Sequence, residues 1–173
     1  LPRWLMALLS GLVNLLRSVP FLILMIIVIP LSRAIVGTSI GTVASIVPLV
    51  IASFPFVSRL VETSMREVDA GVIEAAQSMG ATPLQIITKV MVPESMPSLV
   101  ANVTIAATTI MGYGAMAGII GGGGLGKIAI NYGYYRFNVV LEFFATALLV
   151  VLVQILQTVG TKLAIKCDKR IQK

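Results

Sequence analysis

Residues 121–127, GGGGLGK, are the stretch whose residue types and spacing most resemble a chemical site. They match the pattern G-x-x-x-x-G-K, in which a glycine-rich loop holds the phosphates of a nucleotide. Such loops need Ser or Thr directly after the Lys to bind Mg²⁺, and Ile128 stands there instead. The sequence before the loop does not predict a strand. We therefore interpret the glycines as a hairpin or re-entrant turn that lets helices approach closely.

The other reactive side chains are too few for a catalytic or metal site. The sequence has no histidine and one cysteine, Cys167, so it predicts neither an internal disulfide nor a transition-metal site. No charged residue falls in the middle of a long apolar stretch. Proton- or sodium-driven carriers usually place ionisable groups or broken helices at the membrane midplane. The sequence therefore predicts a protein that catalyses no reaction and binds no metal or cofactor, and it disfavours such a carrier.

The composition indicates a polytopic membrane protein. Hydrophobic residues make up 57% of the chain and charged residues 12%, whereas about 25% charged is typical of soluble domains. Mean hydropathy is +0.99, and the net charge is +6. The basic residues are scattered between apolar stretches, which indicates membrane topology and not a nucleic-acid partner.

Uncharged intervals predict an all-α transmembrane bundle with four crossings. The predicted spans are residues 18–32, 34–58, 99–120 and 143–161. The first is short, but snorkelling by Arg17 and Arg33 would lengthen it, and Pro30 is expected to kink or end it. Residues 4–16 cannot cross about 30 Å of hydrocarbon at about 1.5 Å per residue, so we expect an interfacial helix there.

The polar interruption at residues 72–93 carries signals for two short helices. Asp69 can cap the first, and Gly80 stands where a left-handed residue would end it. Pro93 is expected to end the second. The start of the second helix is marked by a capping hydroxyl, a proline and a capping-box glutamine, at Thr82, Pro83 and Gln85.

Each of these helices has an apolar face. The apolar residues at helical spacing are Val72, Ala76 and Met79 in the first helix and Leu84, Ile87 and Met91 in the second. Helices this short are not stable alone, so they must dock on another surface. That surface is either the rest of this chain or a partner.

The same stretch closely resembles the EAA motif of ABC importer permeases. The matching residues, at the family's spacing, are Glu74, Ala75, Ala76, Gly80, Val90, Val92 and Pro93. Val90 and Val92 replace the family's usual Ile and Leu and remain apolar. The resemblance implies that residues 69–94 form a cytoplasmic coupling loop, within a single permease domain over residues 1–173, that seats in a groove of an ATP-hydrolysing subunit.

Placing this loop in the cytoplasm agrees with the positive-inside rule. Three basic residues then lie outside, Arg33, Lys127 and Arg136. Ten lie inside: Arg3, Arg17, Arg59, Arg66, Lys89, Lys162, Lys166, Lys169, Arg170 and Lys173. The charge balance thus predicts a multi-pass membrane protein with a cytoplasmic C-terminus, and the resemblance implies the bacterial inner membrane.

Small residues in the third predicted span point to close helix packing. Gly114, Gly118 and Gly122 repeat at four-residue spacing, which lets backbones approach, either within the chain or between subunits. Only Tyr113, Met116 and Ile119 would project from that surface. Met116 is therefore a hypothetical hydrophobic gate, whose alternative is an ordinary core position.

The resemblance covers essentially the whole chain and is closest to the methionine-importer permeases. It is carried by residues 17–41, 79–100 and 121–138. That family has a core of five spans, so we expect a further span before Leu1. It works as two permease copies with two ATP-binding cassette subunits, which bind ATP and Mg²⁺, and an extracytoplasmic binding protein. It imports methionine, including the D-isomer.

Two other interpretations remain open from the sequence. One is a carrier or channel that works without ATP, which the EAA spacing disfavours. The other is an ABC permease for a different small solute, because no charged pocket or aromatic cage identifies the cargo.

Overall fold

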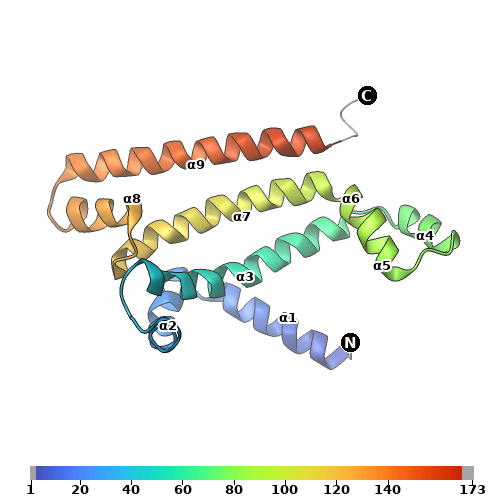
Figure 1. Cartoon of the computed structure of the whole chain (residues 1–173), viewed down its shortest axis with the longest axis horizontal. Coiled ribbons are helices and arrows are strands. Elements are labelled where there is room, and N and C mark those ends of the chain that lie inside the picture. Colours follow the sequence, from blue (N-terminus) through green and yellow to red (C-terminus); the bar gives the residue numbers. More distant parts are fainter. Residues whose placement is uncertain (1–2, 169–173) are drawn as a thin grey trace. The chain divides into compact units, whose positions relative to one another are not determined.

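The computed structural model describes residues 3–168, and all regular structure in this range is helical (Figure 1). The α-helices are α1 (Arg3–Ser18), α2 (Phe21–Val36), α3 (Thr42–Arg66), α4 (Ala70–Ser78), α5 (Pro83–Gln85), α6 (Val92–Glu94), α7 (Met96–Met116), α8 (Gly124–Lys127) and α9 (Val139–Cys167). Three further turns have other hydrogen-bonding patterns. They are the π-helices Ile86–Met91 and Ile128–Tyr134 and the 3₁₀-helix Ala117–Ile120.

The chain divides into two compact units, and α3, α7 and α9 each contribute residues to both. The first unit is Leu1–Phe56 with Ala107–Ile155. Its core is built around Phe21, Met25 and Ala117, with Leu49 and Ala52 packed against them. The Phe21 ring also stacks on Tyr113, with 4.5 Å between ring centroids.

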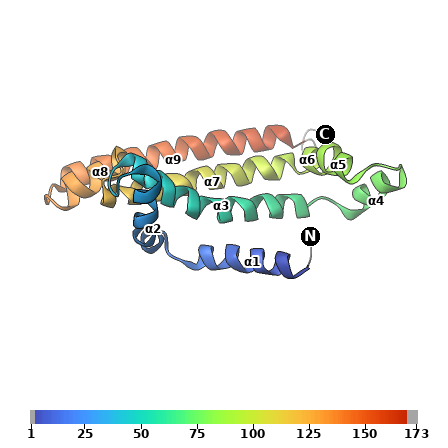
Figure 2. The same cartoon turned by 60° about the horizontal axis from the view of Figure 1, so that its bottom comes forward.

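The second unit is Val57–Ala106 with Leu156–Lys173. Its described part contains the end of α3, the helices α4 to α6, the start of α7 and the end of α9. Within it, α4 and α5 lie beyond the ends of α3 and α7 (Figure 2). On the exposed side of α3, Glu62 forms ion pairs of 2.7 Å with Arg59 and with Arg66, as their helical spacing predicts.

Three helical segments of the described chain are long and apolar enough to cross a membrane. They are Thr42–Arg66, Met96–Ile120 and Val139–Cys167. A fourth crossing is possible if the pair Trp4–Ser18 and Phe21–Val36, bent by 110°, is one broken span. The all-α, membrane-spanning fold predicted from the sequence is confirmed. Residues 169–173 of the predicted cytoplasmic tail lie outside the described residues. So does the span expected before Leu1.

The boundaries of the first two predicted spans differ from those of the helices. Pro30 does not end its helix, because α2 continues to Val36. Gly37 ends it instead, with φ 79° and its N–H bonded to the Arg33 carbonyl at 2.9 Å. The predicted span at residues 34–58 is likewise divided, since α3 begins only at Thr42. A proline in a membrane helix removes one backbone donor, which neighbouring groups can compensate, whereas a left-handed glycine reverses the chain.

Candidate functional site

The turn between α4 and α5 has the geometry that its residues predict. Asp69 caps α4 by accepting a hydrogen bond from the Gly71 N–H at 2.7 Å. Gly80 has φ 80°. The Gly80 N–H donates to the Gln77 carbonyl at 2.9 Å, and the Ala81 N–H donates to the Ala76 carbonyl at 3.1 Å. This paired pattern is a Schellman motif, and it fixes the direction in which the chain leaves α4.

The second helix starts as predicted but ends later. A capping box closes its N-terminus: the Thr82 N–H donates to Gln85 Oε1 at 2.9 Å, and the Gln85 N–H donates to Thr82 Oγ1 at 3.4 Å. The helix then passes through the π-turn Ile86–Met91 and on to Glu94. The prediction that Pro93 ends it is wrong. Pro93 lies in the first turn of α6, where its missing N–H needs no helical partner.

The two short helices pack on each other and leave apolar side chains uncovered. Helix α4 contacts the π-turn, and each contributes one buried residue, Ala76 at 4% and Ile86 at 7% exposure. Most of the predicted apolar faces remain in the open. The exposed members are Val72, Met79, Leu84 and Ile87. The segment therefore carries an apolar surface that this chain does not cover.

The residues of the EAA pattern are distributed over this hairpin. Glu74 and Ala75 are exposed on α4, while Ala76 is buried one position later. Val90 and Val92 are half-buried on the second helix. The capping interactions therefore hold the pattern in one local arrangement, with its polar part accessible.

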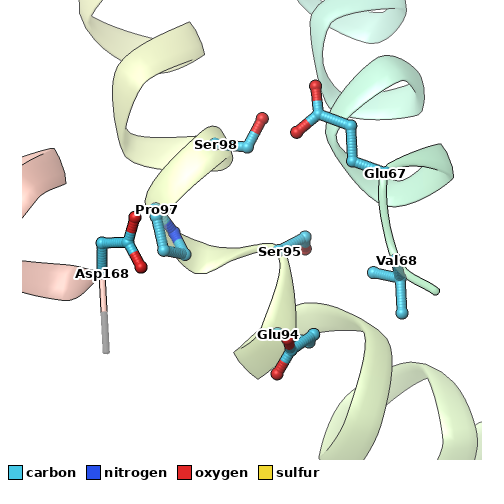
Figure 3. Close-up of a pocket in the computed structure, with 7 residues that line it drawn as sticks. All are labelled: Glu67, Val68, Glu94, Ser95, Pro97, Ser98 and Asp168. Carbon is cyan, nitrogen blue, oxygen red and sulfur yellow. The ribbon is translucent and has the colours of Figure 1, made fainter. Parts of the chain in front are cut away.

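A pocket of about 210 Å³ lies where this segment joins the longer helices (Figure 3). Glu67 and Val68 line it from the end of α3, and Ser95 and Ser98 line it from the start of α7. The Glu67 and Ser98 side chains point toward each other across it. The remaining lining residues are Glu94, Pro97 and Asp168. The pocket thus marks the place where the chain enters and leaves the segment.

In the first unit, the glycine-rich stretch is closely packed by its own backbone. A Cβ placed on Gly118 would lie 2.6 Å from the backbone of Gly126 and of Lys127. A Cβ on Gly122 would lie 2.7 Å from the Ala117 carbonyl oxygen and from Ser45 Oγ. The interpretation of these glycines as sites of close approach is confirmed. For Gly118 and Gly122 the packing is within the chain.

The surface around Met116 differs in part from its prediction. Met116 and Ile119 are 43% and 45% exposed. Tyr113 does not share that surface, because its ring is stacked on Phe21. Gly114 has no other residue within 4 Å of the position of a Cβ. At the end of α7, Met116 is therefore accessible beside Gly114, which has no side chain.

Comparison with known proteins identifies the family. Residues 1–163 match the family described as binding-protein-dependent transport system inner membrane component. The chain belongs to this family. It is 52% identical over 162 residues to the probable D-methionine transport system permease protein MetI of Vibrio cholerae, covering 94% of this chain and 72% of that protein. It is 47% identical over 161 residues to the methionine import system permease protein MetP of Bacillus subtilis, covering 93% and 72%.

A solved structure gives the same fold for this transport component. An inward-facing conformation of the MetNI methionine ABC transporter matches with a TM-score of 0.92 and 45% identity, over 95% of this chain and 76% of that chain. The family resemblance and the fold class expected from the sequence are therefore confirmed.

The sequence reasoning missed several contacts that shape this membrane component. A Cβ on Gly133 would lie 2.7 Å from Glu142 Cβ, and Gly160 leaves room for Thr104. Ser64 is fully buried and accepts a hydrogen bond from Asn102 at 2.7 Å. Asn102 lies in the predicted span at residues 99–120, where its side-chain amide has no water to bond to. A polar residue in a predicted span was the available signal.

Proposed function

We propose that this chain is the membrane-spanning permease of an ATP-driven methionine importer and that residues 69–94 couple it to an ATP-hydrolysing subunit. The observation that carries the proposal is the uncovered apolar surface of α4 and α5, at Val72, Met79 and Leu84. Helices of this length need a surface to dock on. An apolar groove on a partner would cover these side chains.

The local geometry explains how the segment can act as a rigid insert. The Asp69 cap, the Schellman turn at Gly80 and the Thr82–Gln85 capping box fix both helices relative to each other. Glu74 stands exposed on α4, where it can meet a polar group at the rim of a groove. We assign Glu74, Ala75, Ala76, Gly80, Val90, Val92 and Pro93 to this coupling role.

Methionine is proposed because the relatives named above are methionine permeases and cover most of this chain. The assembly would contain a second permease copy, two ATP-binding cassette subunits holding ATP and Mg²⁺, and an extracytoplasmic binding protein. Closure of the ATPase subunits would move the paired coupling segments, and the membrane helices would carry the motion to an outer gate. The ATPase subunits lie in the cytoplasm, so the proposal places the coupling segment and the C-terminus on the cytoplasmic side of the membrane.

The function can be tested by reconstitution. The permease, its ATPase subunit and its binding protein are placed in proteoliposomes, and uptake of labelled L- and D-methionine is measured with ATP or with a non-hydrolysable analogue. We expect uptake only with ATP and its loss in Glu74→Lys, with the ATPase still hydrolysing ATP. Equal uptake without ATP would overturn the proposal in favour of an ATP-independent carrier or channel. Faster ATP-dependent uptake of another solute than of methionine would overturn the assignment of methionine.

The orientation has its own test. Cysteines are introduced as Asn131→Cys or Gln172→Cys in a Cys167→Ser background, and intact cells are treated with an impermeant thiol reagent. We expect labelling at position 131 only, because ten basic residues lie on the side assigned to the cytoplasm and three on the other. Labelling at position 172 alone would reverse the topology.

A further inference from the structure

Four polar side chains connect the end of α3 to the start of α7. Asn102 Nδ2 donates to Ser64 Oγ at 2.7 Å and to the Leu60 carbonyl at 3.3 Å. Ser98 Oγ donates to Ser64 Oγ at 3.3 Å. Ser64 Oγ in turn donates to the Leu60 carbonyl at 3.1 Å. The Ser64 hydroxyl, with one donor and two acceptor positions, is thereby fully used.

Ser95 makes a fourth connection beside these three. Its side chain is 3% exposed, and its Oγ lies 3.6 Å from Met65 Sδ and 3.3 Å from the Val92 carbonyl. We call Ser64, Ser95, Ser98 and Asn102 the polar clamp. Its members lie on both sides of residues 69–94, so the clamp closes the base of that segment.

The same turn of α7 also contacts α9. Thr104, two residues after Asn102, occupies the space that a Cβ on Gly160 would need. Its hydroxyl donates to the Val100 carbonyl at 2.8 Å, and both its hydroxyl and its methyl group lie against Gly160. Asn102 and Thr104 therefore join α7 to two different helices of the second unit.

The position of the clamp determines what it can transmit. The segment at residues 69–94 is connected to α3 and α7 through its two ends. If these ends moved separately, a push on the segment would be absorbed by rotation at residues 67–68 and 95. With the ends joined through Ser64 and Asn102, the ends of α3 and α7 must move together. Ser64 is buried and Asn102 half-buried, and a polar group shielded from water resists separation because it would lose its partner.

We propose that the polar clamp transmits movement of the coupling segment to the membrane helices, with Asn102 as its central positioning residue. This inference rests on the proposed coupling function. This role requires no contact of Asn102 with the transported solute or with ATP. Asn102 acts by keeping two helix ends in register, so its loss should change coupling more than assembly.

The first test removes the hydrogen bonds at similar volume. Asn102→Leu is compared with Asn14→Leu, the same change at an exposed position of α1. Both complexes are purified with bound ATPase, and the methionine transported per ATP hydrolysed is measured in proteoliposomes. We expect this ratio to fall by roughly tenfold in Asn102→Leu, within the range for residues that carry coupling, and to stay unchanged in Asn14→Leu.

The second test replaces the clamp with a covalent bond. The Ser64 and Ser98 Oγ atoms are 3.3 Å apart, so Ser64→Cys with Ser98→Cys places two thiols within reach of a disulfide. The pair is built with Asn102→Leu in a Cys167→Ser background. We expect the oxidised complex to recover coupling and the reduced complex to lose it. Because the comparison uses one purified protein in two redox states, it does not depend on how well Asn102→Leu folds.

The outcomes separate this inference from the proposed function. A wild-type complex without ATP-dependent uptake would refute the proposed function. A coupled wild type with an unchanged ratio in Asn102→Leu would refute the clamp alone. Equal coupling in the oxidised and reduced forms of the cysteine pair would also refute it, because joining the helix ends would then have no consequence.

Discussion

Glycine has two different functions in the coupling segment and where α7 meets α8. In the second unit, Gly80 has φ 80° and nothing within 4 Å of a Cβ position. In the first unit, Gly118 and Gly126 have ordinary φ values, but a Cβ on either would meet backbone atoms. Gly80 is needed because its backbone is left-handed. Gly118 and Gly126 are needed because neighbouring backbone atoms leave no room for a side chain.

Because the glycines have different functions, the two regions should respond differently when a larger residue replaces glycine. A positive φ strains any larger residue whatever the space, at about 1–2 kcal/mol, and the strain can be released by a local change of chain direction. A close backbone contact cannot be released locally, because the neighbouring backbone belongs to the packed interior. The coupling segment should therefore tolerate substitutions that remove function without unfolding the protein, whereas the glycine-rich stretch should not.

The largest effect is expected for Gly126→Ala. Its Cβ would lie 2.5 Å from Ala115 Cα, so a single methyl group forces α8 away from α7. Overpacking of this kind costs about 1–3 kcal/mol or more. We expect a clear drop in the yield of monodisperse protein and in its thermal midpoint in detergent. Gly11→Ala, with nothing within 4 Å, is the matched control and should behave like wild type. A Gly126→Ala protein of normal stability would contradict the distinction between the two kinds of glycine.

The next effect is expected for Gly80→Val, which should abolish ATP-coupled uptake while yield and stability change little. Valine at φ 80° is strained and breaks the Schellman turn, so α4 and α5 lose their relative orientation. Uptake in membrane vesicles measures the loss. Gly80→Asn is the control, since Asn adopts the left-handed conformation more readily, and it should keep most of the uptake. Full uptake by well-expressed Gly80→Val would remove residues 69–94 from the coupling role.

The same two regions show what a single sequence can predict. Asp69, Gly80 and the Thr82–Gln85 box were predictable because a cap and its partner lie within three residues of each other. Pro93 misled because proline is compatible with the first turn of a helix. Pro30, predicted to kink or end its helix, does not end it, because a membrane helix can compensate the missing donor. A cap or a left-handed glycine with a nearby partner therefore locates a helix boundary better than a proline alone does.

Contacts between distant residues were beyond this reasoning. Ser64 and Asn102 are 38 residues apart, and the local bond from Ser64 Oγ to the Leu60 carbonyl gives no sign of Asn102. Helical spacing placed Tyr113 on the same face as Met116. Spacing alone cannot say which side chain a neighbouring helix will cover. Its stacking on Phe21 depends on how α2 and α7 meet. Periodicity gives the faces of a helix, and only packing decides their use.

A smaller, partial effect is expected for Met116→Ala. Met116 is exposed beside Gly114, so two copies meeting at a dimer axis could close the path by excluding water. Alanine removes most of that volume and favours the helix. We expect a raised leak or raised basal ATPase activity in proteoliposomes, with assembly intact. Ile119→Ala, a similar truncation at similar exposure, serves as the comparison. A Met116→Ala complex with the leak and coupling ratio of wild type would assign the residue to packing.

The smallest effect is expected for Thr82→Ala, which tests how much of the coupling segment's geometry depends on one cap. The substitution removes the acceptor of the Gln85 N–H at 3.4 Å, a long and therefore weak bond, and leaves the Gln85 side chain free to keep its bond to the residue 82 N–H. Loss of an N-cap costs about 1 kcal/mol, and retention of the reciprocal bond should reduce this. We expect faster amide exchange at residues 84–86, with uptake lowered by less than about twofold if the Schellman turn at Gly80 carries most of the orientation. Thr82→Ser keeps the hydroxyl and should match wild type in both measurements. Loss of uptake in Thr82→Ala as complete as in Gly80→Val would show that the cap and the left-handed glycine are equally necessary.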